Sequence, residues 1–161
     1  MYSDSNSIRP DFIVSSATGE KQLLVEVKKW LPALMQSGQH TLINKQREKI
    51  GLAECYFLLV TPEVITLWPP ASAIRGESVL RGLSRQMPSA EVLANYLSIE
   101  RYPLNALSEQ ELSLIVSSWL GSVMFKSAAT LLEMPFQAWL VQSGLHQVIY
   151  RGYVRREQLA A

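Results

Sequence analysis

Along the first 70 residues, apolar positions come in short blocks of strand length, separated by turn residues. The blocks at 23–27, 55–60 and 64–68 are rich in β-branched and aromatic residues, which predicts three strands. A shorter apolar run at 12–14 precedes them, and Gly19 marks a turn before the block at 23–27. Because the run at 55–60 is apolar throughout, we expect that strand to be buried on both faces of a sheet.

A helix is predicted between the second and third of these blocks, over residues 30–50. Pro32 falls in its first turn, where a proline is tolerated, and Gly51 is well placed to end it. We expect the outer face of this helix to carry four charged side chains: Lys45, Arg47, Glu48 and Lys49. The first 70 residues therefore follow the order strand, strand, helix, strand, strand.

The second half of the chain has a helical pattern. Ser108 and Glu111 have the spacing of a capping box, in which each side chain bonds the backbone of the other at the start of a helix. The predicted elements are an irregular segment at 71–90, a helix from Ser89 to about Tyr96, a helix over 108–119, another over 123–132 and a last one after Pro135. The chain thus belongs to the α/β class, with a helical C-terminal part.

The composition excludes several classes of protein for this chain. The 161 residues carry a net charge of +1, and 48% of them are apolar, which is typical of a globular domain and not of a disordered chain or a strongly basic DNA-packaging protein. Cys55 is the single cysteine, so an intramolecular disulfide and a multi-cysteine zinc site are excluded. The longest apolar stretch, 112–125, falls short of the about 20 residues that cross a membrane. With no signal-peptide pattern at the N-terminus, we expect a cytoplasmic protein.

The first hairpin brings charged residues together. A turn centred on residues 18 and 19 pairs positions whose numbers add to 37, which sets Asp11 opposite Glu26. Directly opposed residues have Cβ atoms about 4.5–5.5 Å apart. Lys28 shares the face of Glu26, because side chains alternate along a strand. We therefore predict that two carboxylates and one ammonium group meet at one end of the sheet.

This combination of groups suits metal-assisted chemistry. Opposed carboxylates repel each other, and a bound divalent cation removes that repulsion. Mg²⁺ prefers oxygen ligands, polarises a phosphoryl oxygen and lowers the pKa of a bound water. A nearby lysine stabilises the negative charge that develops during attack on the phosphorus. The pattern thus favours hydrolysis of a phosphodiester.

The spacing resembles a known family. Pro10-Asp11, fourteen intervening residues and then Glu26-Val27-Lys28 resemble the motif of the PD-(D/E)xK nucleases. The resemblance implies a mixed sheet of the restriction-endonuclease-like fold in residues 1–100, with 101–161 as a helical extension packed on it. It implies a Mg²⁺-dependent endonuclease acting on DNA, with Mn²⁺ as an alternative cation.

The resemblance also implies roles for individual residues. Asp11 and Glu26 would be metal ligands, Val27 would offer its backbone carbonyl, and Lys28 would assist the attacking water. Further polar residues are common on the helix after the lysine, where the candidates are Gln39, Lys45 and Gln46.

The chain departs from the family pattern at its start. The family fold begins with a helix, which often bears an acidic residue, and a strand that precedes the Pro-Asp pair. Only nine residues precede Pro10. Three explanations remain open: a truncated member, a site completed by a second copy of the chain, or a degenerate relative. Two other functions also remain open, a non-catalytic interaction module on the nuclease scaffold and a plain structural domain.

Partners follow from charge and apolarity. Between residues 20 and 50, basic residues exceed acidic ones by three, so Lys29, Gln39, Lys45 and Gln46 are weak candidates for contact with DNA. An ordinary solvated helix face explains the same charges equally well. The segments 113–120 and 134–150 contain no Asp, Glu, Lys or Arg. Such apolar helices must bury their surface, so we expect a homodimer.

Overall fold

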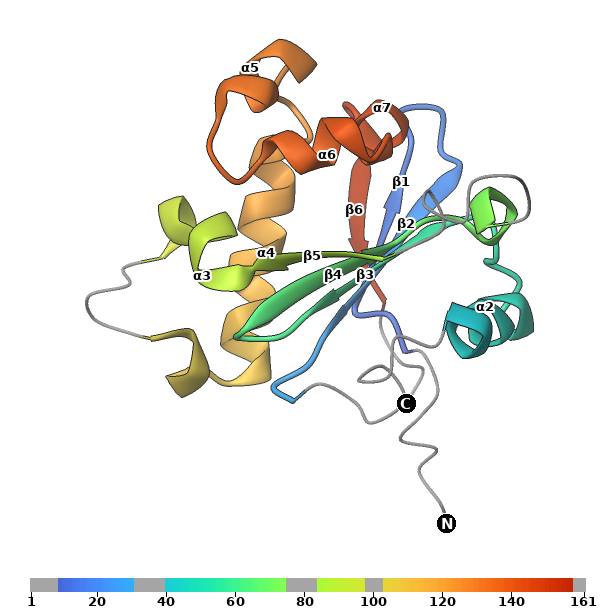
Figure 1. The fold of residues 1–161 in the computed structure, drawn as a ribbon, viewed down its shortest axis with the longest axis horizontal. Helices are drawn as coiled ribbons and strands as arrows, with labels where there is room; N and C mark the ends of the chain where they lie inside the picture. Colours follow the sequence, from blue (N-terminus) through green and yellow to red (C-terminus); the bar gives the residue numbers. More distant parts are fainter. Residues whose placement is uncertain (1–8, 31–39, 75–83, 98–102, 158–161) are drawn as a thin grey trace.

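A six-stranded mixed sheet forms the centre of the protein (Figure 1). The computed structural model describes residues 9–30, 40–74, 84–97 and 103–157. The strands lie in the order β5-β4-β3-β2-β1-β6, and only β2 and β3 pair in parallel. Their bounds are β1 (Phe12–Ser15), β2 (Lys21–Val27), β3 (Tyr56–Val60), β4 (Val64–Trp68), β5 (Arg85–Pro88) and β6 (Tyr153–Arg156).

Helices cover both faces of the sheet, with α2 on one side and α4 on the other (Figure 1). The α-helices are α2 (His40–Lys49), α3 (Ser89–Val92), α4 (Glu109–Val123), α5 (Ala128–Glu133), α6 (Ala138–Gln142) and α7 (Leu145–Ile149). Short 3-10 helices are η1 (Ala71–Ile74), η2 (Ala94–Tyr96) and η3 (Leu104–Ala106). Within the described ranges, no helix is long and apolar enough to cross a membrane.

Alternation along the strands divides the buried side chains into two cores. In β3, Leu58 and Val60 enter the larger core beside α4, whereas Phe57 and Leu59 enter the smaller core beside α2. Ile43 of α2 completes the smaller core. This two-sided burial explains why β3 is apolar throughout, as the sequence predicts.

The predicted inner strands are confirmed, and two edge strands were missed. β5 is exposed or half-buried along its length and carries no apolar alternation. β6, which the sequence presents only as a cluster of arginines, is likewise mostly exposed. Backbone hydrogen bonds hold both strands in the sheet, β5 on β4 and β6 on β1, and neither strand has an apolar face of its own.

The helix ends follow the local chemistry. Ser108 and Glu111 form the predicted capping box, although α4 continues past Trp119 to Val123. Gly51 has the predicted left-handed conformation after α2, with φ of +74°. The structure places Trp30 in a bend before the helix, and residues 31–39 of the predicted helix lie outside the described part.

Arg47 corrects the predicted outer face of α2. Its side chain is fully buried, and Nη1 donates to the carbonyl oxygens of Cys55 at 2.7 Å and Pro69 at 2.6 Å. Helical charge patterns do not reveal such partners, because both carbonyls belong to segments that follow the helix. Arg47 therefore ties α2 to the strands beneath it, while Lys45, Glu48 and Lys49 are exposed as expected.

The helical C-terminal part shares the larger core with the sheet. Trp119 of α4 donates through Nε1 to the Gln137 side-chain oxygen at 2.9 Å, and Gln137 in turn donates to the carbonyl of Val92 at 2.8 Å. All three residues are buried. One amide side chain thus joins α3, α4 and the start of α6.

Replacing Gln137 with Leu is expected to lower the free energy of unfolding by about 3 kcal/mol, because it leaves the Trp119 indole N–H and the Val92 carbonyl buried without partners. Urea denaturation followed by tryptophan fluorescence measures the change. Gln142→Leu, at an exposed position of α6, is the matched control and should change stability by less than about 0.5 kcal/mol. Equal stability of the two variants would contradict the prediction.

Candidate functional site

Glu26 and Lys28 lie on one face at the end of β2. Their positions alternate with Val25 and Val27, which point into the larger core, so both face the side of the sheet that α2 covers. Glu26 is only 2% exposed, and its Oε1 lies 3.4 Å from the Nζ of Lys28, which is 35% exposed. Lys28 therefore contacts both the buried Glu26 carboxyl group and the solvent.

The Glu26 carboxyl group lacks full compensation for its burial. Oε2 is buried and has no hydrogen-bond partner in the part of the chain that is described. Burial raises the pKa of Glu26 from its usual 4.5 to about 7, against the opposing effects of Lys28 and of a hydrogen bond from the Arg9 backbone. Perturbed carboxyl groups of this kind are found at functional sites more often than elsewhere.

The predicted hairpin register is confirmed along most of β1. Phe12, Ile13 and Val14 pair with Val25, Leu24 and Leu23, so each pair adds to 37. At Asp11 the pairing departs from this rule, because its N–H donates to the Val25 carbonyl at 2.7 Å. Asp11 thus lies in a bend just before β1, outside the regular ladder, and the register within the ladder shifts between Val14 and Ser15.

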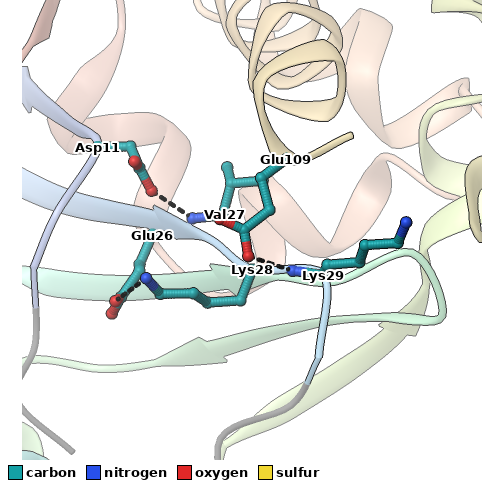
Figure 2. A network of polar contacts seen from close by, with 6 residues as sticks. All are labelled: Asp11, Glu26, Val27, Lys28, Lys29 and Glu109. Carbon is teal, nitrogen blue, oxygen red and sulfur yellow. Dashed lines mark hydrogen bonds and ion pairs between the residues drawn. The ribbon is translucent and has the colours of Figure 1, made fainter. Parts of the chain in front are cut away.

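The Asp11 carboxylate contacts the backbone of β2 rather than a side chain. Its Oδ2 accepts a hydrogen bond of 2.7 Å from the Val27 N–H. Figure 2 shows the Asp11 carboxylate directed at Val27, whereas the Glu26 side chain extends away from it toward Lys28. The directly opposed pair of carboxylates that the sequence predicts is therefore replaced by two groups on either side of the Val27 backbone.

Asp11 nevertheless belongs to the same electrostatic cluster. Partial burial raises its pKa, while the Val27 hydrogen bond and the Lys28 charge oppose the rise. The charge of Glu109 raises it further. Asp11, Glu26 and Lys28 thus influence one another at one end of β2, but the three side chains do not meet at one point as the sequence predicts.

Glu109 is the residue at this site that sequence reasoning missed. It is the first residue of α4, and its Oε1 accepts a hydrogen bond of 2.9 Å from the Lys29 N–H, 80 positions earlier in the chain (Figure 2). Acidic residues are common in the first turn of helices. The sequence pattern therefore offers no signal that distinguishes Glu109 from an ordinary helix-capping residue.

The candidate DNA contacts are only partly placed. Lys45 is exposed and Gln46 half-buried on α2, which covers the same face of the sheet that carries Glu26. Figure 2 shows the Lys29 side chain directed away from Glu26 and Lys28. Gln39 lies outside the described residues.

The site offers carboxyl oxygens, which are the kind of ligand that Mg²⁺ prefers. Oε2 of Glu26 is buried without a hydrogen-bond partner in the described residues, whereas Oδ2 of Asp11 already accepts from the Val27 N–H. In the described ranges, no group of three or more His, Cys, Asp or Glu residues could hold a metal ion. A cation here would therefore complete its coordination with water or with substrate oxygens, as Mg²⁺ commonly does.

A scan against protein-family models and searches of curated proteins and of solved structures found no match to this chain.

Proposed function

We propose that the protein is a divalent-cation-dependent nuclease that hydrolyses phosphodiester bonds of DNA, with the end of β2 as its active site. The observation that carries this proposal is the buried Glu26 carboxyl group, which combines an unpartnered oxygen with a lysine at 3.4 Å. Asp11 lies at the same end of the strand and adds a second carboxylate. The motif Pro10-Asp11…Glu26-Val27-Lys28 resembles the PD-(D/E)xK nucleases in the order and type of these groups.

Each residue has a role in the proposed reaction. Glu26 and Asp11 would hold Mg²⁺ or Mn²⁺, together with the Val27 carbonyl. The bound cation supplies Lewis-acid activation of the phosphoryl oxygen and of water. Lys28 pairs with Glu26 and is partly exposed, and its ammonium group would orient the attacking water and stabilise negative charge at the phosphorus.

Elements from the C-terminal part border the proposed site. β6 pairs antiparallel with β1, and α4 packs on β2 and β6 and brings Glu109 to Lys29.

A non-catalytic interaction module is the second candidate, and one observation favours it. The Asp11 carboxylate already accepts a hydrogen bond from Val27, and Lys28 already partners Glu26. Such compensation is also consistent with a purely structural role, in which the hydrogen bond from Val27 to Asp11 holds the start of β1 against β2. The two functions differ in whether a cation binds.

Adding Mg²⁺ or Mn²⁺ to protein stripped of metal is expected to raise the melting temperature by about 4 °C at ten times the dissociation constant, because the cation binds only the folded state. Differential scanning calorimetry measures the shift. Glu26→Gln should abolish it, whereas the control Glu20→Gln, in the exposed β1–β2 turn, should keep it. A wild-type melting temperature that neither cation moves would favour the interaction module.

We also propose that the protein forms a homodimer through its helical surface. Leu114, Phe125 and Leu132 remain 57%, 61% and 50% exposed on α4, after α4 and on α5. Covering these side chains with a second copy would remove apolar surface from water, which favours association. Sedimentation velocity at micromolar concentration should show a dimer, and Phe125→Glu should shift it to a monomer. A monomeric wild type would contradict the proposal.

A further inference from the structure

We propose that β6 binds single-stranded DNA, with phosphate groups on Arg155 and Arg156 and an unpaired base on the ring of Tyr153. The inference deepens the proposed function by naming the surface that receives the DNA strand, and it rests on that function for the cleavage that follows. Binding at β6 itself requires neither a cation nor cleavage, so it can be measured separately.

β6 is an open edge of the sheet (Figure 1). It stands at one end of the strand order and pairs with β1, so one side of its backbone has no neighbouring strand among the described residues. Three of its four side chains are exposed. A ligand can therefore approach β6 from the side without displacing another element.

The positive charge of this edge has little compensation. Residues 150–157 contain three arginines and a single acidic residue, Glu157. The Arg155 side chain is 71% exposed, and its guanidinium group lies 4.0 Å from the Glu157 carboxylate. Arg151 and Arg156 have no ion-pair partner in the part of the chain that is described. Because a guanidinium group matches the geometry of a phosphate, such arginines suit a nucleic-acid backbone.

Aromatic rings hold two of the arginines in place. The guanidinium carbon of Arg156 lies 5.8 Å from the centre of the Phe12 ring, and that of Arg151 lies 5.3 Å from the centre of the Tyr150 ring. The backbone of Arg151 is fixed as well, because its N–H donates to the Met124 carbonyl at 3.0 Å. Side chains that are already ordered lose less conformational freedom when a ligand binds.

Tyr153 supplies a face for a base. Its side chain is 62% exposed, and it lies on the same face of β6 as Arg155, two positions away. Stacking of a base on an aromatic ring is sequence-tolerant and contributes strongly to the binding of single strands. In a duplex the bases already stack on one another, so an unpaired strand is the form of DNA that can use Tyr153. Negative supercoiling exposes unpaired segments, so a supercoiled plasmid also presents such a strand.

The register relates β6 to the proposed active site. Arg155 is opposite Ile13, which belongs to the smaller core, and Ile13 is opposite Leu24 of β2. Glu26 follows Leu24 by two positions, so Arg155 and Glu26 share one face of the sheet. Arg156 falls on the other face of β6, and the two arginines thus flank the edge. A strand bound along β6 would lie two strands away from Glu26.

An acidic peptide is the other polyanion that could lie along β6. Addition of a peptide strand depends mainly on backbone pairing, and short, charged edge strands disfavour such pairing. β6 has four residues, two of them arginines. The exposed ring of Tyr153 also suits a base better than a carboxylate. These observations favour DNA, and the peptide becomes an outcome of the test.

Arg155→Gln combined with Arg156→Gln should weaken binding of a labelled oligothymidylate about tenfold and lower the slope of log affinity against log salt by about 1.4, because each phosphate contact to a single strand contributes about 0.7. Fluorescence polarisation with the full chain in EDTA measures both quantities. Arg155→Gln alone changes a highly exposed side chain and should lower the slope by about 0.7, even if the double variant folds poorly. Arg85→Gln, at an exposed position of the other edge strand, is the matched control and should leave the slope unchanged.

Tyr153→Ala should weaken binding at least about fivefold without changing the salt slope, because it removes stacking and no charge. Tyr153→Phe keeps the ring and should bind as the wild type does. A general loss of stability at this position would not separate the two effects in this way.

Several outcomes would overturn the inference. They are absence of binding by the wild type, equal loss of slope in Arg155→Gln and Arg85→Gln, and binding of a duplex as tight as that of the oligothymidylate. Displacement of the oligothymidylate by polyglutamate at an equal concentration of charge would identify β6 as a site for acidic peptides instead.

The same variants keep this inference apart from the proposed function. If the wild type nicks DNA with Mg²⁺ and the β6 variants bind and nick DNA equally well, the inference is wrong and the proposed function stands. If the wild type binds the oligothymidylate through β6 but neither Mg²⁺ nor Mn²⁺ supports nicking, the proposed function is wrong and DNA binding at β6 stands.

Discussion

Replacing Lys28 with Met should abolish Mg²⁺-dependent nicking of supercoiled DNA, with a loss of at least about 100-fold in rate. Loss of a single group that stabilises transition-state charge costs about that much in other enzymes. Methionine preserves the length and apolar stem of lysine, so the packing of the half-buried side chain against β2 is retained. Conversion of supercoiled to open-circular plasmid on agarose gels measures the rate.

Asp11→Asn extends this experiment to the proposed metal ligand. The asparagine oxygen can still accept the hydrogen bond from the Val27 N–H, so this contact with β2 is preserved while the charge is lost. A comparable loss of nicking is expected. The control for the Lys28 variant is Arg85→Ala, which removes a positive charge at an exposed position of β5, on an edge strand of the sheet. Full activity of both the Lys28 and Asp11 variants would exclude the proposed active site.

Glu26→Gln should stabilise the metal-free protein at pH 8 by up to about 3 kcal/mol and leave its stability nearly unchanged at pH 4.5. Burial raises the pKa of Glu26 from 4.5 to about 7 in the folded protein, and each pKa unit corresponds to about 1.4 kcal/mol. Urea denaturation in the presence of EDTA, at both pH values, measures the difference.

The direction follows from proton binding. Below pH 4.5 both the folded and the unfolded chain carry the proton on Glu26, so its favourable contribution to folding is complete. Between pH 4.5 and about 7 the folded chain keeps the proton while the unfolded chain releases it, and the contribution is lost as pH rises. Glutamine is neutral at every pH and avoids this loss. If Glu26→Gln gains no more stability at pH 8 than at pH 4.5, the carboxyl group does not titrate in this way.

The same proton links stability to the proposed function. A divalent cation binds the ionised carboxylate, so it must compete with the proton on Glu26. Cation binding should therefore strengthen as pH rises through 7, in the range where the metal-free protein loses stability. A buried acid of this kind costs stability that a structural domain has no reason to retain, which agrees with the proposed role in cation binding.

The inner strands and the helix ends were predictable because their signals are local. β3 has a continuous apolar run since both of its faces are buried, and the Ser108–Glu111 box and Gly51 act through their own backbone neighbours. β5 and β6 were not predictable, because edge strands with exposed side chains carry no apolar pattern. Their place depends on unpaired backbone groups of β4 and β1.

The candidate site was likewise predictable only where its signals are local. Strand alternation puts Glu26 and Lys28 on one face, so local rules suffice for these two residues. The short turn at Gly19 brings Asp11 to the same end of β2 but does not determine where its carboxylate points. The assembled fold alone produces the burial of Glu26, the hydrogen bond from Val27 to Asp11 and the contact of Glu109 with Lys29. A strand's period is a property of a few consecutive residues, whereas desolvation and contacts 80 positions apart arise only when separate elements meet. Residue types and their spacing therefore specify the candidate chemistry, and the assembled fold specifies the charge state and geometry in which those residues can act.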